Sequence, residues 1–161
     1  MYNVVIIGAG QLGSRHLQSI KSTTHECNVC VVDSSDVSLE RCKVIYDGAD
    51  LATNVKEIFF CKDITSLPSE IDFLLIATGS KPRFVLFDAV AKQSTVKNVV
   101  FEKVLFQKEE EYFKTEEILK AKGVNAWVNC PRRMYEVYNK IKPYIFGKTA
   151  NMVVSGGNWG M

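Results

Sequence analysis

Three glycines near the N-terminus have the spacing of a dinucleotide-binding turn. The apolar, β-branched segment 3–7 leads directly into Gly8-Ala9-Gly10-Gln11-Leu12-Gly13, which has the G-x-G-x-x-G pattern. Gly8 permits a sharp turn out of a strand, Gly10 lets the backbone approach a diphosphate, and Gly13 lets the next helix lie close to the sheet. Three glycines at this spacing also occur in ordinary loops, so the prediction depends on the strand before them and the helix-compatible stretch after them.

The helix expected after this turn would itself bind the phosphates. The first backbone N–H groups of a helix have no partner within it and point along the positive end of its dipole. Such a helix end binds a diphosphate favourably. We therefore predict that Gln11 and Leu12 bind the cofactor together with the three glycines.

A carboxylate follows at the distance expected for a ribose-binding residue. Asp33 ends a second apolar run, twenty residues after Gly13. A carboxylate there accepts hydrogen bonds from the hydroxyls of an adenosine ribose and repels a 2′-phosphate. Ser34 follows it, with no adjacent Arg to hold such a phosphate, so NAD is favoured over NADP. The alternative is that Asp33 and Asp36 only cap the next helix.

Small residues follow a later strand candidate and should line the same crevice. Thr78, Gly79 and Ser80 come directly after the apolar segment 71–77, and small residues let the backbone approach a ligand closely. We include all three among the cofactor-binding residues. Lys81 and Arg83 could neutralise phosphate, but a solvated position is expected for both.

Glu102 and Lys103 end the next strand candidate. A Lys at the carboxyl end of a parallel strand directs its ammonium group towards the cofactor crevice, where it can bind a substrate hydroxyl or polarise an oxygen. We predict that Lys103 is catalytic and that both residues contact the cofactor. The alternative is a surface Glu–Lys pair that contributes little.

Two of the five cysteines form a C-x-x-C pattern, Cys27 and Cys30. Both fall in or beside a predicted strand, where positions three apart face opposite sides of the sheet. There is no second C-x-x-C and no His-x-x-x-His to complete a zinc site, so core packing is favoured and no metal site is predicted. An odd number of cysteines without framework spacing favours free thiols in a reducing compartment, with the cytoplasm as the default.

Strand and helix patterns alternate along most of the chain. Strands are predicted at 3–7, 28–32, 57–60, 71–77, 98–101 and 124–129, and helices at 13–21, 37–45, 84–92 and 109–122. Apolar strands without alternation indicate burial on both faces. The pattern predicts an α/β fold: a doubly wound, mostly parallel Rossmann sheet with helices on both faces, plus the start of a truncated second α+β domain.

The last forty residues have a different pattern. Pro131 suits the first turn of a helix, and apolar residues recur at helical spacing from Met134 to Ile145. Pro143 should kink this helix and Gly147 should end it. A strand candidate at 151–155 has no partner in the chain, which suggests a fragment. We expect an NAD(P)-binding Rossmann domain at 1–122, and at 123–161 the last Rossmann strand, a junction helix and the first strand of a truncated substrate domain.

Composition narrows the class of protein. The chain has 161 residues, 47% of them hydrophobic and 24% charged, with a net charge of +2. This charge is too small and too scattered to indicate nucleic-acid binding. No secretion signal and no apolar run of membrane-spanning length is present. The expected partner is a small-molecule substrate, and neither nucleic acid nor a membrane is expected to bind. Assembly into a homo-oligomer is possible.

These motifs together resemble one family of oxidoreductases. The segments that carry the likeness are Gly8 to His16, Asp33, Glu102-Lys103 and Asn129-Cys130-Pro131-Arg132-Arg133-Met134. They are similar to the N-terminal half of the glucose–fructose oxidoreductase and inositol dehydrogenase family (Gfo/Idh/MocA). The resemblance implies a Rossmann domain that binds NAD or NADP, followed by an open antiparallel sheet domain. It also implies oxidation or reduction of a sugar, cyclitol or polyol hydroxyl, with Lys103 touching both nicotinamide ribose and substrate.

Two departures from the family pattern concern the site. Val104 replaces the Pro of the Glu-Lys-Pro motif, and the segment 78–84 lacks a Pro and a His commonly found near it. The family's general acid/base Asp and His would lie beyond residue 161, and neither His16 nor His25 is expected to replace them. His16 is expected to pack or to orient its helix, and His25 to be solvated.

The resulting prediction is the cofactor-binding domain of an NAD-dependent oxidoreductase acting on a sugar, nucleotide sugar or polyol, inactive by itself. A non-catalytic NAD-sensing regulatory module is the alternative. A methyl-donor or flavin site on the same glycine turn is a weaker one, because Asp33 would fit either ribose.

Overall fold

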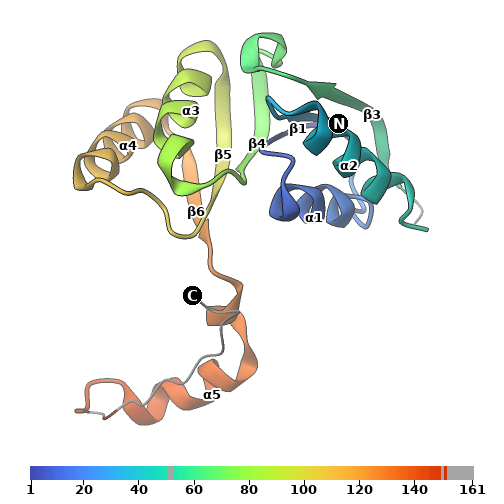
Figure 1. Cartoon of the computed structure of the whole chain (residues 1–161). Coiled ribbons are helices and arrows are strands. Elements are labelled where there is room, and N and C mark those ends of the chain that lie inside the picture. The colour runs from blue at the N-terminus through green and yellow to red at the C-terminus, as the bar shows by residue number, and fades with distance from the viewer. Residues whose placement is uncertain (51–52, 150, 152–161) are drawn as a thin grey trace. The chain divides into compact units, whose positions relative to one another are not determined.

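The first 129 residues form a parallel sheet. The computed structural model describes residues 1–50, 53–149 and 151, and the chain divides into two compact units, Met1–Asn129 and the residues from Cys130 on. In the described residues of the first unit, the strands are β1 Tyr2–Ile7, β2 Cys27–Val32, β3 Val55–Cys61, β4 Glu70–Ile76, β5 Thr95–Glu102 and β6 Asn125–Asn129 (Figure 1). All pairings are parallel, in the order β3-β2-β1-β4-β5-β6. The predicted doubly wound α/β fold is confirmed.

Helices cover both faces of this sheet (Figure 1). They are α1 Gln11–Ile20, α2 Asp36–Asp47, α3 Ser80–Gln93 and α4 Glu109–Lys122, with a short 3₁₀ turn, η1, at Ile64–Ser66. Leu17 of α1 and Leu39 of α2 pack with Val4 and Ile6 on one face, whereas α3 and α4 pack on the other. None of the helices in the described part of the chain has the length and apolar character to cross a membrane.

The strand order places a crevice at the centre of the sheet. Strand β1 lies between β2 and β4, so the chain leaves β1 towards one side and leaves β4 towards the other. In open α/β sheets ligands bind at this switch point, outside the carboxyl ends of the strands. The ends of β1, β2, β4 and β5 carry the glycine turn, Asp33, Thr78 and Glu102 respectively.

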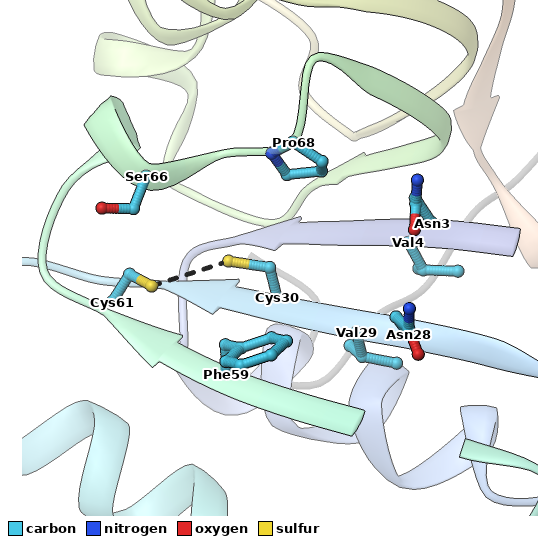
Figure 2. Close-up of a pocket in the computed structure, with 9 residues that line it drawn as sticks. All are labelled: Asn3, Val4, Asn28, Val29, Cys30, Phe59, Cys61, Ser66 and Pro68. Carbon is cyan, nitrogen blue, oxygen red and sulfur yellow. Dashed lines mark hydrogen bonds between the residues drawn. The ribbon is translucent and has the colours of Figure 1, made fainter. Parts of the chain in front are cut away.

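The two cysteines of the C-x-x-C pattern lie in different cores, as predicted. Cys27 packs on the α1 face and Cys30 on the α3 face. Cys30 Sγ lies 3.7 Å from Cys61 Sγ, beside a hollow of about 320 Å³ that has Asn3 and Asn28 at its other end (Figure 2). Burial raises the pKa of the Cys30 thiol to about 12, so this thiol is protonated at neutral pH. In the described residues no group of three or more metal-binding side chains occurs.

The described residues of the second unit contain two short helices where one continuous helix was predicted. A 3₁₀ turn spans Pro131–Met134 and α5 spans Glu136–Ile145, with Tyr135 extended between them. Pro143 lies inside α5, and Gly147 follows it with a positive φ of 71°. The strand predicted at 151–155 falls, apart from Asn151, outside the described residues.

Candidate functional site

Each glycine of the turn has the surroundings that its predicted role requires. Gly8 has a φ of 101°, and its N–H donates to Val32 O at 2.8 Å. A Cβ on Gly13 would lie 1.7 Å from Gly8 O, so α1 packs against the turn as closely as only glycine allows. A Cβ on Gly10 would meet nothing within 4 Å. The space above Gly10 is therefore open to a ligand.

The N-terminus of α1 opens into the same space. Its N-cap is Gly10, which has no side chain to accept from the helix N–H groups, and its first turn contains no acidic residue. Gln11 and Leu12 are exposed, whereas Gly13 and Ser14 are buried. The structure thus places the positive end of a helix dipole, uncapped by a side chain, at the crevice.

Asp33 lies across the turn from these N–H groups. Its Oδ2 accepts from the backbone N–H of Ala9 at 2.8 Å and its Oδ1 from the N–H of Ser35 at 2.9 Å. The N-cap of α2 is Ser35, whose Oγ accepts from the N–H of Ser38, so Asp33 is not the cap of this helix. A carboxylate oxygen has two lone pairs, so Asp33 retains capacity for the hydroxyls of a ligand.

A hollow of about 400 Å³ lies at the carboxyl ends of β1 to β4, beside Gly8 and Asp33. Its lining includes Gly8, Asp33, Ser34, Lys62, Asp63 and Thr78. Lys62 was missed from the sequence because the strand before it was predicted to end at 60. Its Nζ lies 2.7 Å from Asp36 Oδ2, with both side chains well exposed. The hollow therefore has a cation within the region expected to hold a ribose.

The turn after β4 lies against the glycine turn. A Cβ on Gly8 would come within 3.0 Å of Thr78 N. Thr78 Oγ1 is buried and has no hydrogen-bond partner within the described residues. Gly79 is the N-cap of α3 and has no side-chain cap, and Ser80 Oγ accepts from Gln107 at 3.1 Å. Of the three predicted residues, Thr78 lies against the glycine turn at the crevice, and Gly79 and Ser80 begin α3 directly after it.

The prediction of a solvated Arg83 is wrong, whereas Lys81 is exposed as predicted. The Arg83 side chain is 2% exposed, and its guanidinium donates to the carbonyls of Glu102 at 2.5 Å and Leu105 at 2.8 Å. It also donates to those of Val104 and Thr78. Burial lowers the pKa of Arg83, and the nearby Glu102 carboxylate opposes this. Arg83 thus joins the segments after β4 and β5, a contact that local sequence does not reveal.

Glu102 is not part of a surface Glu–Lys pair. It is 4% exposed, and its Oε1 lies 2.8 Å from His16 Nε2 and accepts from Asn129 Nδ2 at 2.6 Å. His16 thus does more than pack, because it joins α1 to the end of β5. Lys103, the next residue, is exposed. The structure brings His16, Glu102 and Asn129 together and leaves Lys103 on the surface beside them.

The chain belongs to the Gfo/Idh/MocA family. The sequence profile of that family, described as "Oxidoreductase family, NAD-binding Rossmann fold", matches residues 2–130. No curated protein sequence matches the chain. The first unit is therefore an NAD-binding Rossmann domain of an oxidoreductase family.

Solved structures of similar fold include several dehydrogenases. The WlbA (WbpB) dehydrogenase from Thermus thermophilus, in complex with NAD and UDP-GlcNAcA, has 17% identity and a TM-score of 0.71, covering 99% of this chain and 53% of that one. The apo scyllo-inositol dehydrogenase from Lactobacillus casei has 17% identity and a TM-score of 0.68, covering 90% of this chain and 41% of that one. An oxidoreductase from Agrobacterium radiobacter, in complex with NAD+, L-tartaric acid and magnesium, has 14% identity and a TM-score of 0.71, covering 89% of this chain and 40% of that one. At such identities the likeness shows the fold, and the chain spans about half of these structures or less.

Proposed function

We propose that the first unit is the cofactor domain of an NAD-dependent oxidoreductase that acts on a hydroxyl or carbonyl of a sugar, nucleotide sugar or polyol. The observation that carries this proposal is the open space above Gly10, bordered by the α1 N-terminus and by Asp33. The neighbours solved with NAD, and those named as inositol dehydrogenases, support the substrate class.

The residues at the crevice fit a dinucleotide. In this proposal the N–H groups at Gln11 and Leu12 hold the diphosphate, and Asp33 and Ser34 hold the adenosine ribose. Thr78, Gly79 and Ser80 border the middle of the cofactor. The nicotinamide ring, when bound, supplies a hydride acceptor or donor.

Lys103 is proposed to orient the substrate. An exposed ammonium group beside the nicotinamide ribose can donate to a substrate oxygen and stabilise negative charge that develops on it. His16 and Glu102 are bonded to each other, so neither is offered as a proton acceptor in the described part of the crevice. We therefore expect the 161-residue chain to bind NAD without oxidising a polyol, and we assign a substrate domain to residues beyond the first unit.

NAD is proposed over NADP because the carboxylate of Asp33 would repel a 2′-phosphate. Lys62 works in the opposite direction, but its charge is paired with Asp36. No observation in the described residues favours the regulatory NAD-sensing alternative.

The test is calorimetric titration of the chain with NAD and NADP in parallel, with Gly10→Ala as the matched variant. A Cβ on Gly10 meets no protein atom but would occupy the proposed diphosphate space. We expect saturable NAD binding that is strongly weakened in Gly10→Ala with little change in thermal stability. Equal NAD affinity in both proteins would refute the site.

A further inference from the structure

We infer that Glu102, held by His16 and Asn129, is a positioning residue that fixes Lys103 at the crevice before the cofactor binds. This inference rests on the proposed function, since it assumes that Lys103 contacts the nicotinamide side of a bound dinucleotide. It assigns to three residues, one each from α1, β5 and β6, the role of holding Lys103 in place for that contact.

The Glu102 carboxylate is held by side chains from two other elements. A single oxygen, Oε1, receives His16 Nε2 at 2.8 Å and Asn129 Nδ2 at 2.6 Å. These partners come from elements far apart in the sequence, 86 residues before and 27 residues after Glu102. The carboxylate therefore ties the end of β5 to the helix that follows the glycine turn and to the neighbouring strand.

The backbone around Lys103 is held by hydrogen bonds as well. Arg83 donates to the carbonyls of Glu102, Val104 and Leu105, one residue before Lys103 and two after it. The main chain at Lys103 is thus fixed on both sides, while its side chain is exposed. Because the backbone at Lys103 is already ordered, less conformational entropy is lost when its ammonium group binds a ligand.

Burying a carboxylate at position 102 costs free energy. A carboxylate that is 4% exposed is expensive to desolvate, and buried ionic groups are often replaced by apolar ones without loss of stability. Packing alone would be served by an apolar residue at position 102. A buried carboxylate that accepts from both His16 and Asn129 is explained if Glu102 must fix the direction of the chain at Lys103.

The experiment is a double-mutant cycle read out as NAD affinity in the full 161-residue chain. In the wild-type background Lys103→Ala should weaken NAD binding roughly 3- to 10-fold, the effect of one hydrogen bond. In a Glu102→Ala background the same substitution should change affinity less than 2-fold, since an unpositioned Lys103 no longer contributes. If the two effects multiply instead, Glu102 is only structural and the inference is overturned.

Paired variants separate positioning from folding. His16→Gln keeps a donor near the Nε2 position and should retain the full Lys103→Ala effect, whereas His16→Leu removes the donor and should reduce it. Glu102→Gln keeps an acceptor and should behave like the wild type. If Glu102→Ala does not fold, judged by circular dichroism, the His16→Leu and His16→Gln cycles decide: equal Lys103→Ala effects in both would overturn the inference.

Different results would refute the NAD site and the positioning role of Glu102. If the wild-type chain binds no NAD, the proposed function fails, and the inference fails with it. If the wild type binds NAD and Lys103→Ala has no effect in any background, the NAD site stands and only the positioning role is refuted.

Discussion

Gly13→Ala should destabilise the first unit clearly, whereas Gly10→Ala should change its stability little. The Cβ added at position 13 would lie 1.7 Å from Gly8 O and 2.8 Å from Gly8 C. To reach ordinary van der Waals separation, the two atoms must move apart by roughly 1.5–2 Å. The obstacle is backbone of a turn that is itself bonded to Val32, so α1 must be displaced.

The size of the effect follows from two opposing contributions. Overpacking of a close-packed site costs about 1–3 kcal/mol or more, and a backbone obstacle favours the upper end. Replacing Gly by Ala inside a helix contributes about 1 kcal/mol in the opposite direction. We expect a net loss of about 2 kcal/mol or more in the free energy of unfolding, and a melting temperature lower by roughly 5–10 °C.

The assay is thermal and urea unfolding followed by circular dichroism for the wild type, Gly13→Ala and Gly10→Ala. The Cβ in Gly10→Ala meets nothing within 4 Å, so this variant should unfold within about 1 kcal/mol of the wild type, the cost of Ala in place of Gly at a helix N-cap. Wild-type stability in Gly13→Ala would refute the close packing of α1 on the turn. An equal loss in both variants would show that the glycines are needed for some reason other than the space around them.

Three further predictions concern charge and pH. Asp33→Asn should weaken NAD binding roughly 10-fold or more and raise the NADP-to-NAD affinity ratio, measured by calorimetry; an unchanged ratio would count against the ribose assignment. Hydrogen bonds from Lys97 and from the backbone N–H of Asn3 lower the pKa of Asp72 from its ordinary value of 3.8. The ionised Asp72 therefore stabilises the folded protein above pH 3.8, and this contribution is lost as the pH falls through the pKa of the folded state. Asp72→Asn should therefore be less stable than the wild type by roughly 1–2 kcal/mol at pH 7, and this difference should disappear in acid urea titrations. Burial raises the pKa of Cys30 from 9.0 to about 12, so the contribution of its thiol to the free energy of unfolding is complete below pH 9.0 and is lost as the pH rises towards 12. Between about pH 8 and 10 the Cys30→Ala variant should therefore lose less stability than the wild type, measured by urea unfolding.

Much of the sheet and the glycine turn could be predicted from sequence because their signals are local. Unbroken apolar runs identified the central strands β1 and β2, which are buried on both faces. The bounds predicted for the helix at 109–122 agree with those of α4, which has acidic residues in its first turn and Gly123 directly after it. The start of α3 was placed four residues late, since Gly79 gives no side-chain cap and Pro82 lies in the first turn.

The polar contacts of the site could not be predicted, because they join residues far apart in the chain. Composition and spacing give no sign that Arg83 would find its acceptors about twenty residues later, at Glu102 to Leu105. The same holds for His16, whose partner depends on how α1 lies across the end of β5. Such contacts follow from the topology, so they become visible only after the strand order is known.

The bonds from His16 and Asn129 to the Glu102 carboxylate have a consequence for how the domain folds during synthesis. Asn129, one of its two donors, is the last residue of β6, the edge strand at the C-terminal end of the sheet. During synthesis the phosphate-binding turn is therefore complete long before the chain that steadies Lys103 has emerged. Non-local parallel pairing of this kind forms slowly, so acquisition of a fully ordered crevice should be a late folding event.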